Sequence, residues 1–281
     1  MVEIRIAGPD DIPAIVAMRA SAGWQAYQWA LHDAMRPPHA RFWIGFDGGE
    51  PVATGSGISY GAFGVVGNMV VAETHRRQGL GSAVLERVLD FLSSRGATSV
   101  ELSATADGRP LYERHGFVSA GGSAMVAVPR DAPLDVADDL RVTPAAPENL
   151  NELAAYDVPR FGGDRAALLA AALADPQRPV LLSRRGAELV GYAVLRLEGG
   201  RLGPWLADDT AVASALLGAT IARAPEALTI GTNIGHDNGA GVHWLHGIAS
   251  AFGSWDGRMR LGPEPERRSA TIYGNAVGAL G

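Results

Sequence analysis

The sequence predicts an α/β protein made of two similar modules in tandem. Strand-like and helix-like hydrophobic patterns alternate along its 281 residues, a length that suits one large domain or two ordinary ones. The elements of the second half follow the same order as those of the first. An acidic, Pro-containing stretch without clear periodicity separates the halves. We therefore expect an N-terminal domain over residues 1–130, a linker over 131–139 and a C-terminal domain over 140–281.

The first half divides into elements at clear turn signals. Gly48 and Gly49 mark a hairpin turn, and Pro37 and Pro38 end a helix. Pro110 stands near the first position of another helix, where its missing N–H costs little. The expected strands span 2–7, 41–46, 52–60, 65–72, 98–104 and part of 117–128, and the expected helices begin at Pro9 and span 24–35, 82–95 and 107–116.

The second half repeats this order with one omission. Residues 186–191 resemble residues 49–55, and residues 206–209 resemble residues 71–74, but the second copy then passes directly into a helix. The expected strands span 140–142, 179–184, 188–197, 201–206, 228–231, a stretch around Met259 and 271–274, and the expected helices span 147–156, 164–174, 210–223 and 238–249.

Composition excludes several classes of protein. The hydrophobic fraction of 47% suits a soluble core, no apolar run is long enough for a membrane span, and residues 1–6 alternate like a strand rather than a signal peptide. The chain has no Cys, so it has neither disulfides nor thiolate chemistry, and we expect a cytoplasmic protein. A net charge of −6 argues against nucleic acid as a partner. Every basic residue is Arg, which excludes Lys Schiff-base chemistry.

The segment from Arg76 to Ser82 is the strongest functional signal. It joins a predicted strand to a predicted helix, where backbone N–H groups are unpaired and the helix dipole favours an anion. Gly79 and Gly81 allow a phosphate to approach the main chain because no Cβ intervenes. The second half lacks this turn, so we expect one phosphate site per chain.

Two motifs together resemble the GNAT superfamily of acyl-CoA-dependent N-acyltransferases. Arg76, Gly79 and Gly81 match its (Arg/Gln)-x-x-Gly-x-(Gly/Ala) signature at the start of a helix. Residues 111–117, which read Leu-Tyr-Glu-Arg-His-Gly-Phe, resemble a second block of the family. The C-terminal half resembles the degenerate second repeat of tandem members, and Gly163-Asp164-Arg165 contributes to that likeness. The resemblance implies two modules, each a mixed, largely antiparallel sheet flanked by helices.

The resemblance also implies acetyl-CoA as co-substrate and a set of residues that bind it. The turn would bind the pyrophosphate, the preceding strand would pair with the pantetheine arm, and a backbone N–H near Val70 or Val71 would bind the thioester carbonyl. Thr105 stands where the family often has an Asn that contacts pantetheine. The implied cofactor-binding residues are Met69, Val70, Val71, Arg76, Arg77, Gln78, Gly79, Leu80, Gly81, Ser82 and Thr105.

Tyr112 stands where the family places a general acid that protonates the departing thiolate. Residues 63–72 contain no carboxylate, so the usual general base is missing. Either the amine arrives neutral or loses its proton to water, or Glu101, His75 or the terminal carboxylate of Gly281 accepts the proton. The missing base also leaves a non-catalytic acyl-CoA sensor or binding module as an alternative function.

The expected acceptor is a primary amine of a small molecule or peptide. Trp24 and Tyr27 lie in the region that borders the acceptor site in this fold, and they are the candidate substrate contacts, with plain core packing as the alternative. A longer acyl-CoA is an alternative donor. The second module would complete the acceptor cleft or supply a homodimer surface. His243 and His246 have no well-placed third ligand, so no metal site is expected.

Overall fold

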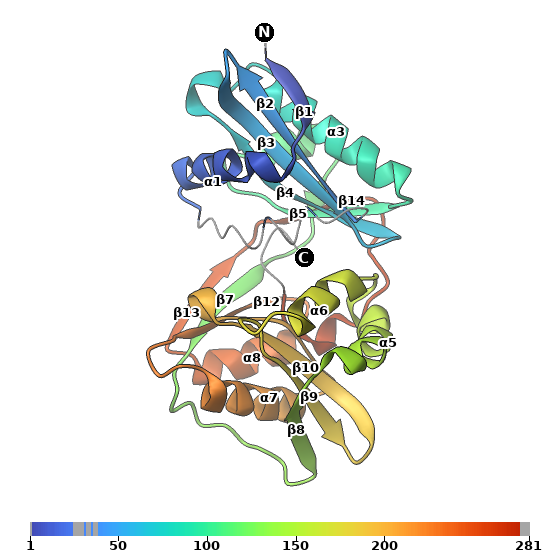
Figure 1. Cartoon of the computed structure of the whole chain (residues 1–281), viewed down its shortest axis with the longest axis vertical. Coiled ribbons are helices and arrows are strands. Elements are labelled where there is room, and N and C mark those ends of the chain that lie inside the picture. Colours follow the sequence, from blue (N-terminus) through green and yellow to red (C-terminus); the bar gives the residue numbers. More distant parts are fainter. Residues whose placement is uncertain (1, 25–30, 32–34, 36–38, 276–281) are drawn as a thin grey trace. The chain divides into compact units, whose positions relative to one another are not determined.

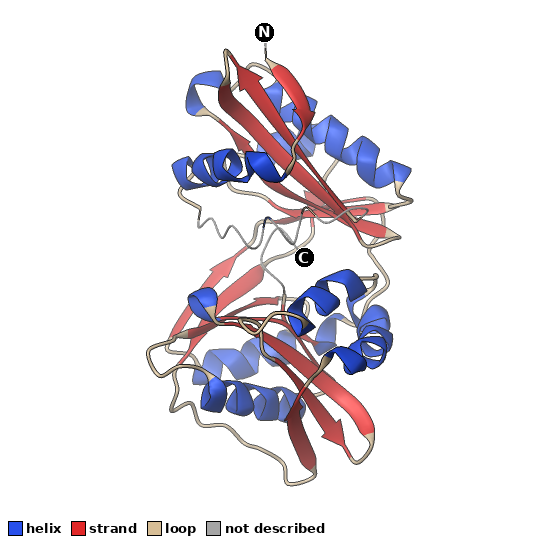
Figure 2. Ribbon diagram, in the orientation of Figure 1, coloured by secondary structure: helices blue, strands red, loops and turns tan. Residues whose placement is uncertain are grey.

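A computed structural model describes residues 2–24, 31, 35 and 39–275 (Figures 1 and 2). These residues form two compact units, and neither unit is continuous in sequence. The first unit holds the described residues up to Ala120 together with Gly257–Pro265, and the second holds Gly121–Asp256 together with residues 266–275. Within the described residues, no helix is both long and apolar enough to cross a membrane.

The first unit is built on a seven-stranded sheet with the order β1-β2-β3-β4-β5-β14-β6. Its neighbouring strands are antiparallel except for β4 and β5, which are parallel. The strands are β1 (Glu3–Ile6), β2 (Ala40–Asp47), β3 (Glu50–Ser59), β4 (Phe63–Val71), β5 (Ser99–Ser103), β6 (Val118–Ser119) and β14 (Arg258–Leu261).

Helices cover both faces of this sheet, with α1 (Ile12–Ser21) on one face and α3 (Leu80–Ser94) on the other (Figure 1). The apolar stripe of α3 is buried on strands that carry glycine beneath it. A Cβ on Gly55 would lie 2.5 Å from Val84 Cγ1, and one on Gly64 would lie 2.6 Å from Leu92 Cδ2. These glycines therefore let α3 pack close to the sheet. The close packing places the N-terminus of α3 beside the end of β4. The short helix α4 (Arg109–Arg114) follows β5.

The second unit repeats this plan. Its eight-stranded sheet has the order β8-β9-β10-β11-β12-β7-β13, with β15 paired to β11 outside this path, and β11 and β12 are the parallel pair. Its strands are β7 (Ser123–Val128), β8 (Leu140–Pro144), β9 (Val180–Arg185), β10 (Glu188–Arg196), β11 (Arg201–Ala207), β12 (Ile230–Gly235), β13 (Ala251–Trp255) and β15 (Ile272–Gly274). Its helices are α5 (Leu150–Phe161), α6 (Ala166–Leu173), α7 (Thr210–Arg223) and α8 (Gly239–Ile248).

The two halves of the sequence exchange strands, so neither compact unit coincides with the predicted ranges 1–130 and 140–281. β7 comes from the first half of the chain but lies between β12 and β13 in the second sheet. β14 comes from the second half but lies between β5 and β6 in the first sheet. A division at residues 130 and 140 would remove an internal strand from each sheet, because strand pairing joins segments that are far apart in the sequence.

The Gly163-Asp164-Arg165 motif has a structural role in the second unit. The guanidinium of Arg165 donates to both carboxylate oxygens of Asp157 at 2.9 and 2.7 Å, and both side chains are almost fully buried. Tyr192 of β10 donates to the same carboxylate, and the Arg165 guanidinium lies 3.8 Å from the ring centre of Phe161. The motif thus joins α5, the loop before α6, and β10 through a buried ion pair.

Candidate functional site

The end of β4 separates from its parallel neighbour. β4 and β5 pair only between residues 63–66 and 99–102, whereas β4 stays paired with β3 as far as Val71. Beyond Val66, the other edge of β4 therefore has no partner strand within residues 39–275. The N–H and C=O groups of an unpaired strand edge are free to bind an extended ligand.

A β-bulge at Asn68 lies at the point of separation. Val66 is opposite Gly57 and Val70 is opposite Thr54, so β4 has one residue more than β3 across this interval. Asn68 adopts a left-handed backbone conformation with φ of 56° and is 3% exposed. Asn accepts this conformation more readily than most non-glycine residues.

The bulge decides which backbone groups face the open edge. The Ala72 N–H donates to the Val52 carbonyl at 2.8 Å, and groups along an antiparallel strand alternate between its two edges. The N–H and C=O of Val71 must then point away from β3. Arg76 Nε, 3.3 Å from the Val71 carbonyl oxygen, donates to it from that side. Without the extra residue, Val71 would take the place of Ala72 and donate into β3.

Side chains from α1 and β3 hold the bulge. Asn68 Nδ2 donates to Ser56 Oγ at 2.8 Å, and Arg19 Nη1 donates to Asn68 Oδ1. Burial lowers the pKa of Arg19, and its guanidinium lies 5.8 Å from the ring centre of Trp24. Sequence reasoning missed this network, although a lone Asn within an apolar strand is the signal that marks it.

The predicted anion-binding turn follows β4 after one short 3-10 turn, Glu73–His75. Arg77 and Gly79 have positive φ values of 60° and 85°, and α3 begins at Leu80 without a capping side chain. The N–H groups of residues 77–82 make no hydrogen bond to the described chain. Gln78 Nε2 donates to the Thr74 carbonyl at 3.1 Å, which holds the turn. Successive free N–H groups at a helix N-terminus form a concave anion site.

The second predicted motif lies beside this turn. A Cβ on Gly81 would be 3.2 Å from Leu111 Cδ2 of α4, so the two helices meet closely there. Thr105 Oγ1 accepts the Gly108 N–H at 3.2 Å, and the hydroxyl thus helps to begin α4. The fold therefore brings together β4 residues 69–71, the turn at 76–79, α3 residues 80–82, Thr105 and α4.

Tyr112 on α4 is nearly buried, and its hydroxyl has no hydrogen-bond partner within the described chain. The side chain is 6% exposed and contacts Phe117 edge to face, with ring centres 5.9 Å apart. Burial raises the pKa of Tyr112 to about 12, so the phenol stays protonated at physiological pH. A phenol without a partner in the chain is available to donate to a ligand.

The predicted general bases and substrate contacts that lie within the described residues interact with neighbouring side chains. His75 Nε2 is 3.3 Å from Asp47, and this hydrogen bond lowers the pKa of the Asp47 carboxyl. Glu101 faces Arg258 of β14 at 3.8 Å. Trp24 lies three residues beyond the end of α1 and is half-buried. Tyr27, most of the predicted helix 24–35 and Gly281 lie outside the described residues. Within residues 2–24 and 39–275, no three His, Asp or Glu side chains form a cluster that could hold a metal.

Family models match both units. Residues 15–117 match the model described as the acetyltransferase (GNAT) family, and residues 153–274 match one described as an acetyltransferase (GNAT) domain. The second match ends within β15, at its last residue, Gly274. Together these matches span most of both sheets.

Named relatives and solved structures agree with these matches. The chain is 26% identical over 160 residues to the uncharacterized N-acetyltransferase YitH of Bacillus subtilis, an alignment that covers 56% of each protein. It is 25% identical over 248 residues to a holothin acyltransferase of a Pseudoalteromonas species, covering 85% of this chain and 81% of that one.

Similarity of fold extends over the whole chain. A proposed acetyltransferase from Pyrococcus horikoshii superposes with a TM-score of 0.82 at 22% identity, covering all of this chain and 96% of that one. A GCN5-related N-acetyltransferase from Sphaerobacter thermophilus superposes with a TM-score of 0.63 at 17% identity, covering 95% and 98%. At these identities the superpositions establish the fold.

Proposed function

The chain belongs to the GNAT acetyltransferases, and on this premise we propose that its first unit transfers an acetyl group from acetyl-CoA to a primary amine of a small molecule or peptide. The observation that carries the proposal is an edge of β4 that is unpaired within residues 39–275, followed after a short 3-10 turn by N–H groups that are free within the described chain. An extended ligand that ends in phosphates matches that arrangement.

The residues fit coenzyme A in two places. The free N–H groups of residues 77–82 would bind the pyrophosphate, and Arg77, exposed in the turn, would add a charge-assisted contact. The open edge of β4 would pair with the amide groups of the pantetheine arm, as an added strand pairs with a sheet edge. The side chain of Arg76 is already bonded to the Val71 carbonyl, so its main role would be to hold the turn against β4.

Acetyl-CoA supplies an activated carbonyl; the new C–N bond forms as the C–S bond breaks and the sulfur leaves as a thiolate. The Val71 N–H, which faces the open edge, would donate to the carbonyl oxygen as negative charge develops on it. The Tyr112 hydroxyl would donate its proton to the departing sulfur. The nitrogen proton would go to water or to a second amine, because β4 offers no carboxylate. Water would then return a proton to Tyr112.

The direct test is thiol release from acetyl-CoA in the presence of a panel of amines, including polyamines, amino acids, peptides and heteroaromatic amines. We expect at least one amine to release coenzyme A and form its N-acetyl derivative, identified by mass spectrometry. If acetyl-CoA binds but no amine in the panel releases thiol, the chain is instead an acyl-CoA-binding module. A parallel panel of acyl-CoA donors with longer chains tests which acyl chain length the site accepts.

The bulge gives a second prediction. Asn68→Ala should lower kcat about tenfold relative to Asn68→Gly, since a left-handed conformation costs Ala roughly 1–2 kcal/mol and Gly almost nothing. Both variants lose the same hydrogen bonds to Ser56 and Arg19. The difference in kcat between the two variants therefore reports whether the bulge keeps the Val71 N–H on the open edge. Steady-state kinetics measures kcat, and thermal unfolding measures the stability of each variant. Equal kcat values for the two variants would contradict this role.

A further inference from the structure

The second unit carries a strand of its own in the place where the first unit is open. β11 and β12 pair directly only at Arg201 and Gly231. β15 pairs with β11 in antiparallel fashion, with Leu206 opposite Ile272 and Trp205 opposite Gly274. On its other side, the Asn275 N–H donates to the Asn233 carbonyl of β12 at 2.8 Å. β15 thus lies between β11 and β12.

This position corresponds to the open edge of the first unit. β11 and β12 are the parallel pair of the second sheet, as β4 and β5 are of the first, and α7 follows β11 as α3 follows β4. The gap that we assign to pantetheine in the first unit is therefore filled in the second by the backbone of β15.

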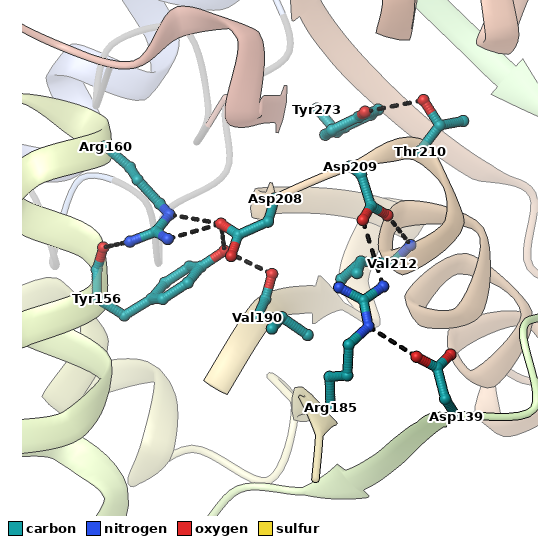
Figure 3. A network of polar contacts seen from close by, with 10 residues as sticks. All are labelled: Asp139, Tyr156, Arg160, Arg185, Val190, Asp208, Asp209, Thr210, Val212 and Tyr273. Atoms are coloured by element: carbon teal, nitrogen blue, oxygen red, sulfur yellow. Dashed lines mark hydrogen bonds and ion pairs between the residues drawn. The ribbon is translucent and has the colours of Figure 1, made fainter. Parts of the chain in front are cut away.

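The side chains of β15 fit this gap closely. Tyr273 is 2% exposed, and its ring centre lies 5.6 Å from that of Trp205 and 6.0 Å from that of Trp244. Its hydroxyl is 3.1 Å from Oγ1 of Thr210, the first residue of α7 (Figure 3). A Cβ on Gly274 would lie 2.5 Å from Thr232 Oγ1, so only glycine fits there.

Carboxylates lie beside the N-terminus of α7, at the end of the gap that corresponds to the anion-binding turn of the first unit. Asp209 caps α7, with Oδ1 accepting the Val212 N–H at 2.8 Å, and Arg185 approaches its Oδ2 at 3.3 Å (Figure 3). Asp208 is held by Arg160 at 2.6 Å. The helix N-terminus that would attract phosphate already bonds a negative side chain of the chain itself.

We propose that β15 is the built-in occupant of the second unit's cofactor cleft, bound by strand addition, and that the chain consequently binds coenzyme A in the first unit only. The proposal rests on the assignment of coenzyme A to the first unit. The occupant is residues 272–275 of the same chain, with Tyr273 as the anchor and main-chain hydrogen bonds on both sides.

Calorimetry with coenzyme A tests the stoichiometry on the full chain. We expect one molecule bound per wild-type chain, and binding about 100-fold weaker by Gly79→Asp, which puts a negative charge in the first unit's turn. Two molecules per wild-type chain, or one bound by Gly79→Asp with wild-type affinity, would overturn the proposal. No binding by the wild type would instead overturn the proposed function while agreeing with a closed second cleft.

Hydrogen exchange shows which residues are protected when coenzyme A binds. Added coenzyme A should increase protection in residues 67–82 and leave residues 201–207 and 272–275 unchanged. Gly274→Val should raise exchange at 201–207 at least tenfold, whereas the control Gly253→Val, where a Cβ meets nothing within 4 Å, should not. Loss of protection at 272–275 on adding coenzyme A would show that β15 is displaced by the ligand, which contradicts a permanent occupant. Unchanged exchange in Gly274→Val would show that β15 is not seated in the cleft.

Discussion

Gly79→Asp is expected to weaken coenzyme A binding about 100-fold, equivalent to ~3 kcal/mol, while leaving the protein folded. Gly79 directly precedes α3 at the centre of the free N–H groups, so a carboxylate there repels the pyrophosphate and competes for the same donors. An acidic side chain at a helix N-terminus is favourable for the free protein, which offsets part of the strain of a side chain at the positive φ of Gly79. Calorimetric titration with coenzyme A, together with thermal unfolding, measures both effects.

The matched control is Gly79→Asn. Asn has nearly the size of Asp and tolerates the positive φ of 85° at this position, but it carries no charge. We expect it to reduce affinity only a few-fold. Comparable losses for the two variants would mean that steric filling dominates, and an unchanged affinity in folded Gly79→Asp would remove the turn from the cofactor site.

Tyr112→Phe is expected to lower kcat by about 10²–10³-fold and leave the dissociation constant for acetyl-CoA within about twofold, as general acids contribute on this scale. Folding should be unaffected or slightly favoured, because the hydroxyl bonds nothing within the described chain and its removal leaves no group unpaired. The measurements are single-turnover thiol release, equilibrium binding and thermal unfolding.

Tyr156→Phe is the matched control for this substitution. The Tyr156 hydroxyl lies 2.7 Å from the Val190 carbonyl and 2.9 Å from Asp208 (Figure 3), so its loss should destabilise the second unit by roughly 1–3 kcal/mol and leave kcat unchanged. A Tyr112→Phe enzyme with wild-type kcat would exclude the phenol as the acid.

The pH profile provides an independent test of Tyr112. Its pKa is raised to about 12 by burial, so the proton-donating form persists as the pH rises and is lost only above pH 11. Activity should rise with pH as the acceptor amine loses its proton, and loss of the Tyr112 proton should cause no fall up to pH 10. Proton transfer from this phenol to a thiolate with an ordinary pKa of about 8.5 is uphill, so water must return a proton to the Tyr112 phenolate for the transfer to go forward.

Much of the candidate site could be predicted from the sequence because the motifs that define it are local. The turn at 76–82 and the block at 111–117 each lie within one short segment. Their contact at Gly81 and Leu111 follows from the fold that both motifs predict. The helix predicted over 210–223 has the bounds observed for α7. Local periodicity and turn chemistry are sufficient for such elements.

Features that depend on pairing between distant segments were not accessible. The bulge at Asn68 exists only relative to β3, so the alternation along β4 alone does not reveal it. Residues 271–274 are predicted as a strand, but nothing in their own sequence shows that they lie between β11 and β12. The exchange of β7 and β14 likewise depends on which sheet edge each strand meets, which the order of elements does not specify.

The exchange of strands delays completion of the first sheet until most of the second unit has been synthesised. The first sheet cannot close the gap between β5 and β6 until residue 261 is available, although its other strands end at residue 119. During synthesis, the N-terminal segment therefore has an exposed β5 edge until β14 is made. An exposed strand edge can pair with strands of other chains and cause aggregation. The separation of more than 150 residues between β5 and its partner β14 also predicts slow final assembly. Because each sheet contains a strand from the other half of the sequence, we expect both units to be lost together in a single unfolding transition.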